Sequence, residues 1–373
     1  MLTKEELNRY QRQTILPEIG SAGQEKLKNA RVLVVGAGGL GCPVLLYLAA
    51  AGVGTLGIVD GDCVSESNLH RQILYRMADV NTPKVEIATK RLRELNPFVQ
   101  TIAYAHHLDR TNALDILQQY DLVVDCTDNF AARYLTNDAC VILNKPLVYA
   151  AIHRFEGQVA VFNYTDASGQ TGSTYRCLFP EPPGPDEAPN CNEAGVMGVL
   201  PGIIGLYQAN EVIKIITGTG HVLSGELLIM DLLEMNTRKI HIRRHPEAGN
   251  ITELIDYDIF CNSFNPDQMR ELTPAELQEK LDSGESWTIV DVREPYEYDI
   301  CHLPDTLLIP MSQVSRHLDQ IPKDSPVVVY CHHGMRSAHV IRQLQQQGYI
   351  NLHNLAGGID SWAREVDEEM EKY

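Results

Sequence analysis

The chain has 373 residues, of which 44% are hydrophobic and 21% charged, a composition typical of globular proteins with room for two or three domains. Its net charge of −18 argues against a general nucleic-acid or anionic-membrane surface, because such surfaces need fields of Lys and Arg. The opening residues lack a signal peptide's apolar core, no apolar run could span a bilayer, and nine scattered cysteines do not resemble a disulfide framework. We therefore expect a cytoplasmic protein without nucleic-acid or membrane partners.

The first part of the sequence alternates helix-like and strand-like segments. A polar helical stretch (5–28) precedes an apolar strand (31–35), a glycine-rich turn and an apolar helix-like run (44–51). Further strands are expected at 56–59, 101–106, 121–125, 146–152 and 157–162, and helices at 82–95, 112–120 and from 129 to about 143. This alternation predicts an α/β fold with a doubly wound, mostly parallel, Rossmann-like sheet.

The remaining sequence contains a crossover, a linker and a second alternating unit. A Pro-rich stretch (165–193) leads to a long apolar helix (199–216) and two hairpin-like strands (226–231 and 237–242). The second unit has expected helices at 274–281, 336–347 and 358–366, and strands at 287–291, 306–309 and 326–331. We expect a first domain at 1–245, a linker at 246–270 and a smaller α/β domain at 271–373.

The glycine-rich turn indicates a nucleotide. Gly36, Gly38 and Gly41 fit the G-x-G-x-x-G pattern, in which the amides of a helix N-terminus face a phosphate. Asp60 closes the next apolar strand, at the distance typical of a ribose-binding carboxylate. The alternative is a turn that merely packs a helix tightly on a strand. The turn alone does not say which nucleotide binds.

The residues after the turn favour a triphosphate with Mg²⁺. Ser67-Asn68-Leu69-His70-Arg71 and Lys84 follow, and Asp128-Asn129 comes after a later strand. Arg and Lys neutralise phosphate oxygens, and Asp holds a hard cation through oxygen. A nicotinamide oxidoreductase is disfavoured, because no hydride-transfer site is evident.

These stretches resemble the MoeB/ThiF family of adenylyltransferases, which are related to ubiquitin-activating enzymes. The resemblance covers roughly residues 5–245, and the matching stretches are Arg9–Gln13, Gly36–Cys42, Asp60–Gln72, Asp125–Asn129 and Cys191–Val196. It implies that ATP is bound by the glycine turn, Gly39 above all, and by Asp60, Ser67, Asn68, Leu69, His70, Arg71, Lys84, Asp128 and Asn129.

The resemblance also implies roles for single residues. Asp60 would hold the ribose, Asp128 the Mg²⁺, and Arg12 the phosphates bound by the neighbouring subunit of a homodimer. The implied reaction adenylates the C-terminal glycine of a small ubiquitin-like sulfur carrier (MoaD/ThiS-like), with Arg12, Arg71 and Lys84 neutralising charge.

Two family features involve cysteine. Cys191 occupies the reactive-cysteine position before a helix, where a thioester or disulfide with the carrier is one reading and an inert thiol the other. Many members hold a structural zinc with two Cys-x-x-Cys pairs. Here these positions read Thr174-Tyr-Arg-Cys177 and His245-Pro-Glu-Ala248-Gly, so we expect no zinc site.

The second domain carries a loop with nucleophile chemistry. Cys331-His332-His333-Gly-Met-Arg336 follows an apolar strand and opens a helix, so backbone amides, the helix dipole and Arg336 converge on Cys331. Cysteine phosphatases use a longer loop, and this tighter ring suits a persulfide sulfur. We expect His332 and His333 to be exposed loop residues and not bases or metal ligands.

Residues 271–370 resemble a single-domain rhodanese, a sulfurtransferase. The resemblance makes Cys331 the persulfide carrier and Arg336 a ligand of the anionic sulfur or its donor, while Asp291 and Arg293 match a motif for which a structural ion pair and catalysis both stay open.

Together the two resemblances imply carrier adenylation followed by sulfur transfer to give a thiocarboxylate. The pathway (molybdopterin, thiamine, cysteine or tRNA thiolation) stays open, as does the donor, a cysteine desulfurase or thiosulfate. The alternatives are an activating enzyme for a ubiquitin-like protein modifier conjugated through a thioester, and a catalytically silent scaffold, which the intact site residues disfavour.

Overall fold

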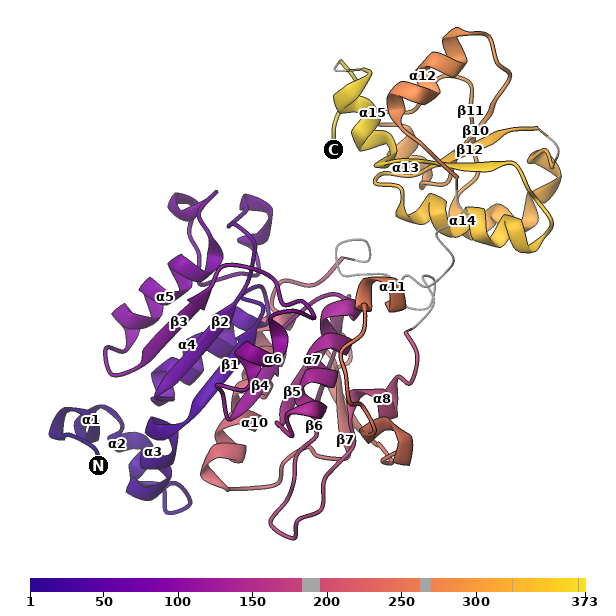
Figure 1. Ribbon diagram of the computed structural model, residues 1–373. Coiled ribbons are helices and arrows are strands. Elements are labelled where there is room, and N and C mark those ends of the chain that lie inside the picture. The colour runs from indigo at the N-terminus through magenta and orange to yellow at the C-terminus, as the bar shows by residue number, and fades with distance from the viewer. Residues whose placement is uncertain (183–194, 262–269, 324, 368) are drawn as a thin grey trace. The chain divides into compact units, whose positions relative to one another are not determined.

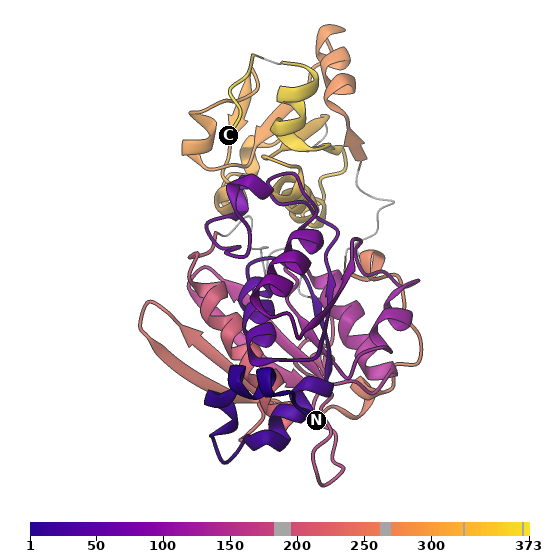
Figure 2. The same ribbon diagram turned by 90° about the vertical axis from the view of Figure 1, so that its left-hand side faces the viewer.

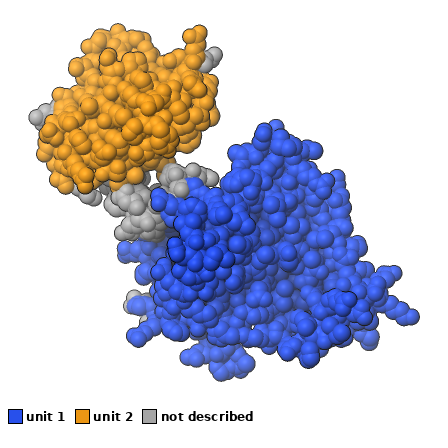
Figure 3. Space-filling model, turned by 180° about the vertical axis from the view of Figure 1, so that it is seen from behind, with its two compact units in different colours: residues 1–262 blue, residues 263–373 orange. Residues whose placement is uncertain are grey.

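The chain folds into two compact units, residues 1–262 and 263–373 (Figure 3). The computed structural model describes residues 1–182, 195–261, 270–323, 325–367 and 369–373. Each unit contains its own sheet and its own hydrophobic core. The predicted fold class, a mostly parallel doubly wound sheet followed by a smaller α/β domain, is confirmed.

Unit 1 is built on an eight-stranded sheet with the order β3-β2-β1-β4-β5-β6-β7-β8 (Figure 1). The strands are β1 (Arg31–Val35), β2 (Thr55–Val59), β3 (Gln100–Tyr104), β4 (Leu122–Asp125), β5 (Leu147–His153), β6 (Glu156–Phe162), β7 (Glu226–Asp231) and β8 (Asn236–His241). β1 to β5 pair in parallel, whereas β6, β7 and β8 join by antiparallel pairing. The order in which strands are added reverses at β1: β2 and β3 lie on one side of it, and β4 and the later strands lie on the other.

Helices cover both faces of this sheet (Figure 2), because strand side chains alternate between them. In β1, Val32 and Val34 belong to the core cluster that also contains residues of α4, α5 and α10. Leu33 and Val35 belong to the opposite cluster, which includes residues of α6 and α7. These helices are α4 (Gly41–Ala51), α5 (Lys84–Leu95), α6 (Ala113–Leu117), α7 (Phe130–Ile142) and α10 (Leu200–Thr217).

Shorter helices complete unit 1. They are α1 (Lys4–Arg9), α2 (Gln11–Thr14), α3 (Gly20–Asn29), α8 (Tyr175–Leu178) and α11 (Tyr257–Cys261). α11 lies in the stretch that the sequence assigns to the linker, yet it packs against α7 as part of unit 1. Tyr257 is buried, and its hydroxyl donates to Asp138 Oδ2 at 2.7 Å.

Unit 2 has a five-stranded parallel sheet with the order β11-β10-β12-β13-β9. Its strands are β9 (Arg270–Leu272), β10 (Thr288–Asp291), β11 (Thr306–Leu308), β12 (Val327–Tyr330) and β13 (Leu352–Leu355), and its helices are α12 (Pro274–Asp282), α13 (Pro295–Tyr298), α14 (Met335–Gln346) and α15 (Gly358–Glu365). β12 is buried throughout and lies at the centre of the sheet, so the Cys331 loop after it starts from there.

No helix in the described part of the chain is long and apolar enough to cross a membrane.

Candidate functional site

A cavity of about 510 Å³ opens at the carboxyl ends of β1, β2 and β4. This is the point where the strand order reverses, the usual ligand site of doubly wound sheets. Eight of the predicted nucleotide-binding residues line it: Gly36, Gly38, Gly39, Asp60, Arg71, Lys84, Asp128 and Asn129.

The glycine turn brings the backbone close to this cavity. Gly36 has a φ of +94°, and a Cβ there would lie 2.7 Å from the Cys126 carbonyl oxygen. A Cβ on Gly41 would lie 2.0 Å from the Gly36 carbonyl oxygen, so this glycine is needed for the turn itself, beneath the cavity lining. A Cβ on Gly38 would meet only Gln72 Nε2, at 3.5 Å. The turn therefore needs glycine at two positions for its fold, and leaves Gly38 and Gly39 facing the cavity.

A buried cluster of charges forms the β2 side of the cavity. Asp60 is 8% exposed, and its two oxygens accept the backbone N–H groups of Ala37 (2.8 Å) and Asp62 (2.9 Å). Burial raises the pKa of Asp60, and the Lys84 ammonium opposes that shift. Lys84 is 4% exposed and contacts Asp62 Oδ2 at 2.8 Å and Asp60 Oδ1 at 3.9 Å. Lys84 thus lines the cavity with its ammonium group held between two carboxylates.

Asp128 lies three residues after β4 and is exposed in the lining of the cavity. The turn before it is shaped by buried Asp125, whose Oδ1 accepts the N–H (2.9 Å) and the hydroxyl (2.6 Å) of Thr127. Burial raises the pKa of Asp125. Asn129 caps α7, because its side-chain oxygen accepts the Ala132 N–H at 2.9 Å. The exposed Asp128 carboxylate therefore stands before a helix N-terminus on a fixed turn.

Other predicted site residues lie elsewhere. Ser67, Asn68, Leu69 and His70 lie on the 3₁₀ turn Glu66–Asn68 and just after it, outside the described cavity lining. Arg12 is exposed on α2, away from the lining of its own chain's cavity. Cys191 lies outside the described residues.

Two segments that line the cavity were missed by the sequence interpretation. One is the loop 107–111, which follows β3 at the same edge of the sheet. There the Asp109 carboxylate accepts the Thr111 hydroxyl and N–H, which lowers the pKa of Asp109. The sequence could have indicated this loop, because the loop after β3 in a parallel sheet lies at the same edge as the loops after β1 and β2. The other segment, Ile255 to Tyr257, gave no such signal, because it lies in an aperiodic stretch.

The positions matching the family's zinc ligands lie together. Cys177 Sγ accepts the backbone N–H groups of Thr174 and His245, both at 3.3 Å. The Thr174 hydroxyl donates to the Ala248 carbonyl oxygen at 3.2 Å. The four positions offer one thiol, one imidazole, one hydroxyl and one alanine, so only two of them are residue types that hold zinc, which takes Cys, His, Asp or Glu.

In unit 2, Cys331 follows β12 directly and is 1% exposed. Its sulfur accepts the Gly334 N–H at 3.2 Å and lies 3.5 Å from Ser337 Oγ. The Cys331 carbonyl oxygen accepts the Ile359 N–H at 2.9 Å, so the loop is fixed to the first turn of α15. Donors therefore already converge on the sulfur.

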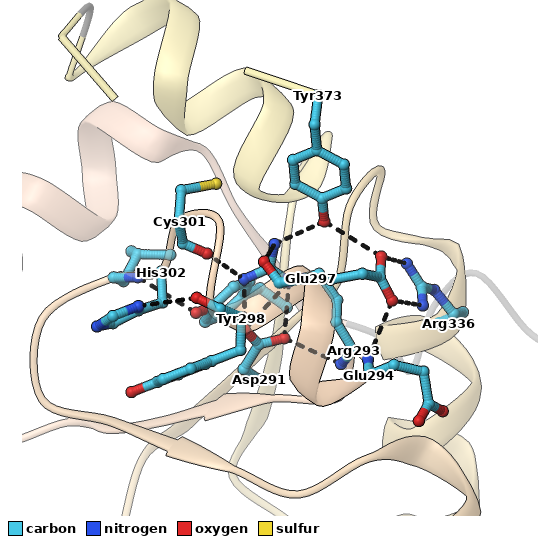
Figure 4. Close-up of polar contacts among 11 residues, drawn as sticks. Asp291, Arg293, Glu294, Glu297, Tyr298, Cys301, His302, Arg336 and Tyr373 are labelled. Atoms are coloured by element: carbon cyan, nitrogen blue, oxygen red, sulfur yellow. Dashed lines mark hydrogen bonds and ion pairs between the residues drawn. The ribbon is translucent and has the colours of Figure 1, made fainter. Parts of the chain in front are cut away.

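The described part of unit 2 contains two buried or partly buried ion pairs, one of which includes Arg336 of this loop (Figure 4). Asp291 and Arg293 are both fully buried and pair at 2.6 Å, which favours the structural reading of that motif. Arg336 contacts both carboxylate oxygens of Glu297, at 2.6 and 2.7 Å. This bond lowers the pKa of Glu297 to about 2, against the burial that raises it.

His332, His333 and Asp360 also gather beside Cys331. Their ligand atoms lie within 4.8 Å of one another, although Asp360 is already paired with Arg364 at 2.8 Å. His332 is half-buried and His333 exposed.

Comparisons with known proteins identify the family of each unit. The ThiF family matches residues 10–250, and the Rhodanese-like domain matches residues 273–365. The chain is 46% identical over its whole length to a probable adenylyltransferase/sulfurtransferase MoeZ from Mycobacterium tuberculosis, covering 96% of that protein. It is 42% identical over its whole length to adenylyltransferase and sulfurtransferase MOCS3 from Drosophila grimshawi, covering 87% of it. A sulfur carrier protein adenylyltransferase from Thermus thermophilus is 55% identical over 69% of this chain and 98% of its own.

Solved structures agree with the fold of unit 1. A crystal structure of PaaA covers 65% of this chain and 75% of its own, with a TM-score of 0.55 and 25% identity. Escherichia coli MccB with ATP covers 65% of this chain and 73% of its own, with a TM-score of 0.56 and 24% identity, a likeness in fold alone. The chain thus belongs to the ThiF family with a rhodanese-like domain after it, and it is an ATP-using adenylyltransferase and a sulfurtransferase.

Proposed function

We propose that this enzyme adenylates the C-terminal glycine of a small ubiquitin-like sulfur-carrier protein and then transfers sulfur to it from a persulfide on Cys331. The observation that carries the proposal is the presence in one chain of a cation-lined cavity at the sheet's reversal point and a cysteine loop with converging donors. The names of the relatives support a carrier protein as the acceptor.

In the first step, a carboxylate oxygen of the carrier attacks the α-phosphorus of ATP. The bond to the bridging oxygen breaks, and pyrophosphate leaves with the electron pair. Lys84 and Arg71, which line the cavity, neutralise phosphate charge, and Arg12 of the neighbouring subunit adds to this in a homodimer. Asp60 holds the ribose. Catalysis of this kind is mostly alignment and charge neutralisation.

A magnesium ion fits the first site. Asp128 offers an exposed carboxylate beside the phosphate-binding turn, and Mg²⁺ prefers one or two carboxylates together with phosphate oxygens. Such an ion would offset the charge on the leaving pyrophosphate.

In the second step, the terminal sulfur of the Cys331 persulfide attacks the carbonyl carbon of the acyl-adenylate, and AMP leaves. The product is an acyl disulfide between the carrier and Cys331. A thiolate must then attack the Cys331 sulfur, which releases the thiocarboxylate and leaves a disulfide between that thiol and Cys331. A second thiol reduces this disulfide and returns the Cys331 thiol. Cys191 is our candidate for the first of these two thiols, with a thioester to the carrier as its other role.

The sulfur donor and the pathway are left open between thiosulfate and a cysteine desulfurase, and between molybdopterin, thiamine, cysteine and tRNA thiolation. We place the reaction in the cytoplasm, where reducing conditions keep thiols available.

Asp128→Ala tests the first step. The variant should lose carrier-dependent ATP–pyrophosphate exchange, because the metal and the phosphates are no longer aligned. Asp166→Asn, in an exposed turn, is the control that removes one charge from the same unit. A normal exchange rate in Asp128→Ala would refute the assignment. A thiocarboxylate on the carrier, weighed by mass spectrometry in the presence of a sulfur donor, distinguishes the proposal from thioester conjugation of a protein modifier.

We also propose that the chain holds no structural zinc. The contacts among Thr174, Cys177, His245 and Ala248 join the two segments directly, so hydrogen bonds replace metal ligation there.

A further inference from the structure

The arginine of the persulfide loop is already committed to a carboxylate. Glu297, on α13, is 5% exposed, and its two oxygens accept both terminal nitrogens of Arg336 (Figure 4). Glu297 Oε2 also accepts the Glu294 backbone N–H at 3.0 Å. The bidentate geometry is the strong form of this interaction, and it leaves the guanidinium with little net charge to offer an anion.

Tyr373 holds Glu297 from the other side. Its hydroxyl donates to Glu297 Oε1 at 3.1 Å and accepts from Arg293 Nη1 at 2.7 Å. Its ring stacks on the ring of His332, with centroids 4.4 Å apart and an interplanar angle of 14°. Tyr373 therefore links the buried Asp291–Arg293 pair to the Glu297–Arg336 pair and covers one side of the loop.

Two further arginines of unit 2 are also paired with carboxylates. Arg293 is matched by Asp291 at 2.6 Å, and Arg364 by Asp360 at 2.8 Å. Among the described residues, each of the three guanidinium groups in this region contacts a carboxylate. A small dianion approaching the loop thus meets backbone amides and guanidinium groups that are each paired with a carboxylate.

We propose that Glu297, held by Tyr373, is a specificity-determining residue that cancels the charge of Arg336 and so selects monoanionic sulfur donors over dianionic ones at Cys331. The inference rests on the proposed role of Cys331 as the persulfide carrier and names a property of that same site.

The chemistry shows where charge matters. With thiosulfate, the Cys331 thiolate attacks the sulfane sulfur, the S–S bond breaks, and sulfite leaves as a dianion with the electron pair. With cysteine persulfide, the thiolate attacks the terminal sulfur and cysteine thiolate leaves. Both steps give the same persulfide on Cys331, but the first brings one more negative charge to the loop.

Glu297→Gln keeps the shape of the side chain and removes its charge. Loading of Cys331 is measured with the full-length protein and either thiosulfate or cysteine persulfide, by mass spectrometry of the Cys331 peptide. We expect the rate with thiosulfate to rise about tenfold and the rate with cysteine persulfide to change less than about twofold. The reason is that removing the Glu297 charge leaves the Arg336 charge unbalanced, and this favours the donor with the extra negative charge. Asp299→Asn is the matched control, since it removes one exposed carboxylate just after the same helix. It should leave both rates unchanged.

Tyr373→Phe keeps the ring on His332 and removes only the hydroxyl. Because Glu297 is then less restrained, thiosulfate loading should rise about two- to threefold, and this variant carries the test if Glu297→Gln does not fold. If both loading rates fell equally, the Glu297–Arg336 pair would be purely structural and the proposal would be overturned. An unchanged ratio of the thiosulfate rate to the cysteine persulfide rate would overturn it too. If the wild-type protein forms no persulfide on Cys331 with either donor, the proposed function itself fails, which is a separate outcome.

Discussion

The glycines of the turn after β1 differ in how much space each leaves for a side chain. Gly41 and Gly38 belong to one turn, yet a Cβ on Gly41 would lie 2.0 Å from a carbonyl oxygen, whereas one on Gly38 would meet a side-chain amide at 3.5 Å. The first contact is impossible without moving the backbone, and the second is ordinary packing.

This contrast gives a prediction for the nucleotide site. Gly41→Ala should lower the thermal midpoint of unit 1 and abolish ATP binding measured by calorimetry, because the phosphate turn cannot form. Gly38→Ala is the control, and its midpoint should match the wild type. Equal midpoints for all three proteins would show that the turn adapts, contrary to this reading.

Glu297 predicts a dependence of stability on pH. Its pKa is lowered from 4.5 to about 2 in the folded protein by Arg336. A lowered pKa stabilises the folded state above pH 4.5, and that stability is lost as the pH falls from 4.5 towards 2. We expect about 2–3 kcal/mol of unit 2 stability to depend on this ionisation.

The measurement follows from the positions of the two tryptophans. Trp287 and Trp362 are the chain's only tryptophans and both lie in unit 2, so their fluorescence in urea reports on that unit alone. The difference in unfolding free energy between wild type and Glu297→Gln should be largest near pH 7 and shrink below pH 4.5. A difference that does not vary with pH would contradict the assignment, and Asp299→Asn serves again as the exposed control.

At the scale of elements, the features that can be predicted from the sequence are those that leave a hydrophobic period or that follow the end of a strand. The buried strands follow from apolar runs, and the positions of the glycine turn and Asp128 follow from their place after the carboxyl ends of strands. β13 was missed because it carries buried Asn354, which accepts the Ser337 hydroxyl at 2.7 Å, so the strand lacks an apolar run. The Ile255–Tyr257 segment was missed because a contact to Asp138, distant in the sequence, places it.

The junction of α8 with the segment at 245–248 predicts metal independence. Hydrogen bonds of 3.2 to 3.3 Å already hold the two segments together, so a chelator should leave the thermal midpoint unchanged. Plasma mass spectrometry of the purified protein should find far less than one zinc per chain. The triple variant Thr174→Cys, His245→Cys and Ala248→Cys completes four thiols with Cys177 and should bind about one zinc. One tightly bound zinc in the wild type would overturn the proposal.

At the scale of the whole molecule, each unit has its own sheet and its own core clusters. The cavity lies wholly in unit 1 and the Cys331 loop wholly in unit 2. Each half of the reaction should therefore survive the loss of the other, although the final product needs both.

Two variants separate these halves. Cys331→Ser should keep carrier-dependent ATP–pyrophosphate exchange and accumulate the acyl-adenylate, because nothing in unit 1 depends on the thiol. Asp128→Ala should load sulfur on Cys331 at the wild-type rate yet make no thiocarboxylate, because no adenylate forms to be attacked. Mass spectrometry of the carrier and of the Cys331 peptide measures both products in one reaction mixture. Loss of exchange in Cys331→Ser, with an unchanged thermal midpoint, would mean instead that the loop takes part in adenylation, and the division of chemistry between the units would have to be abandoned.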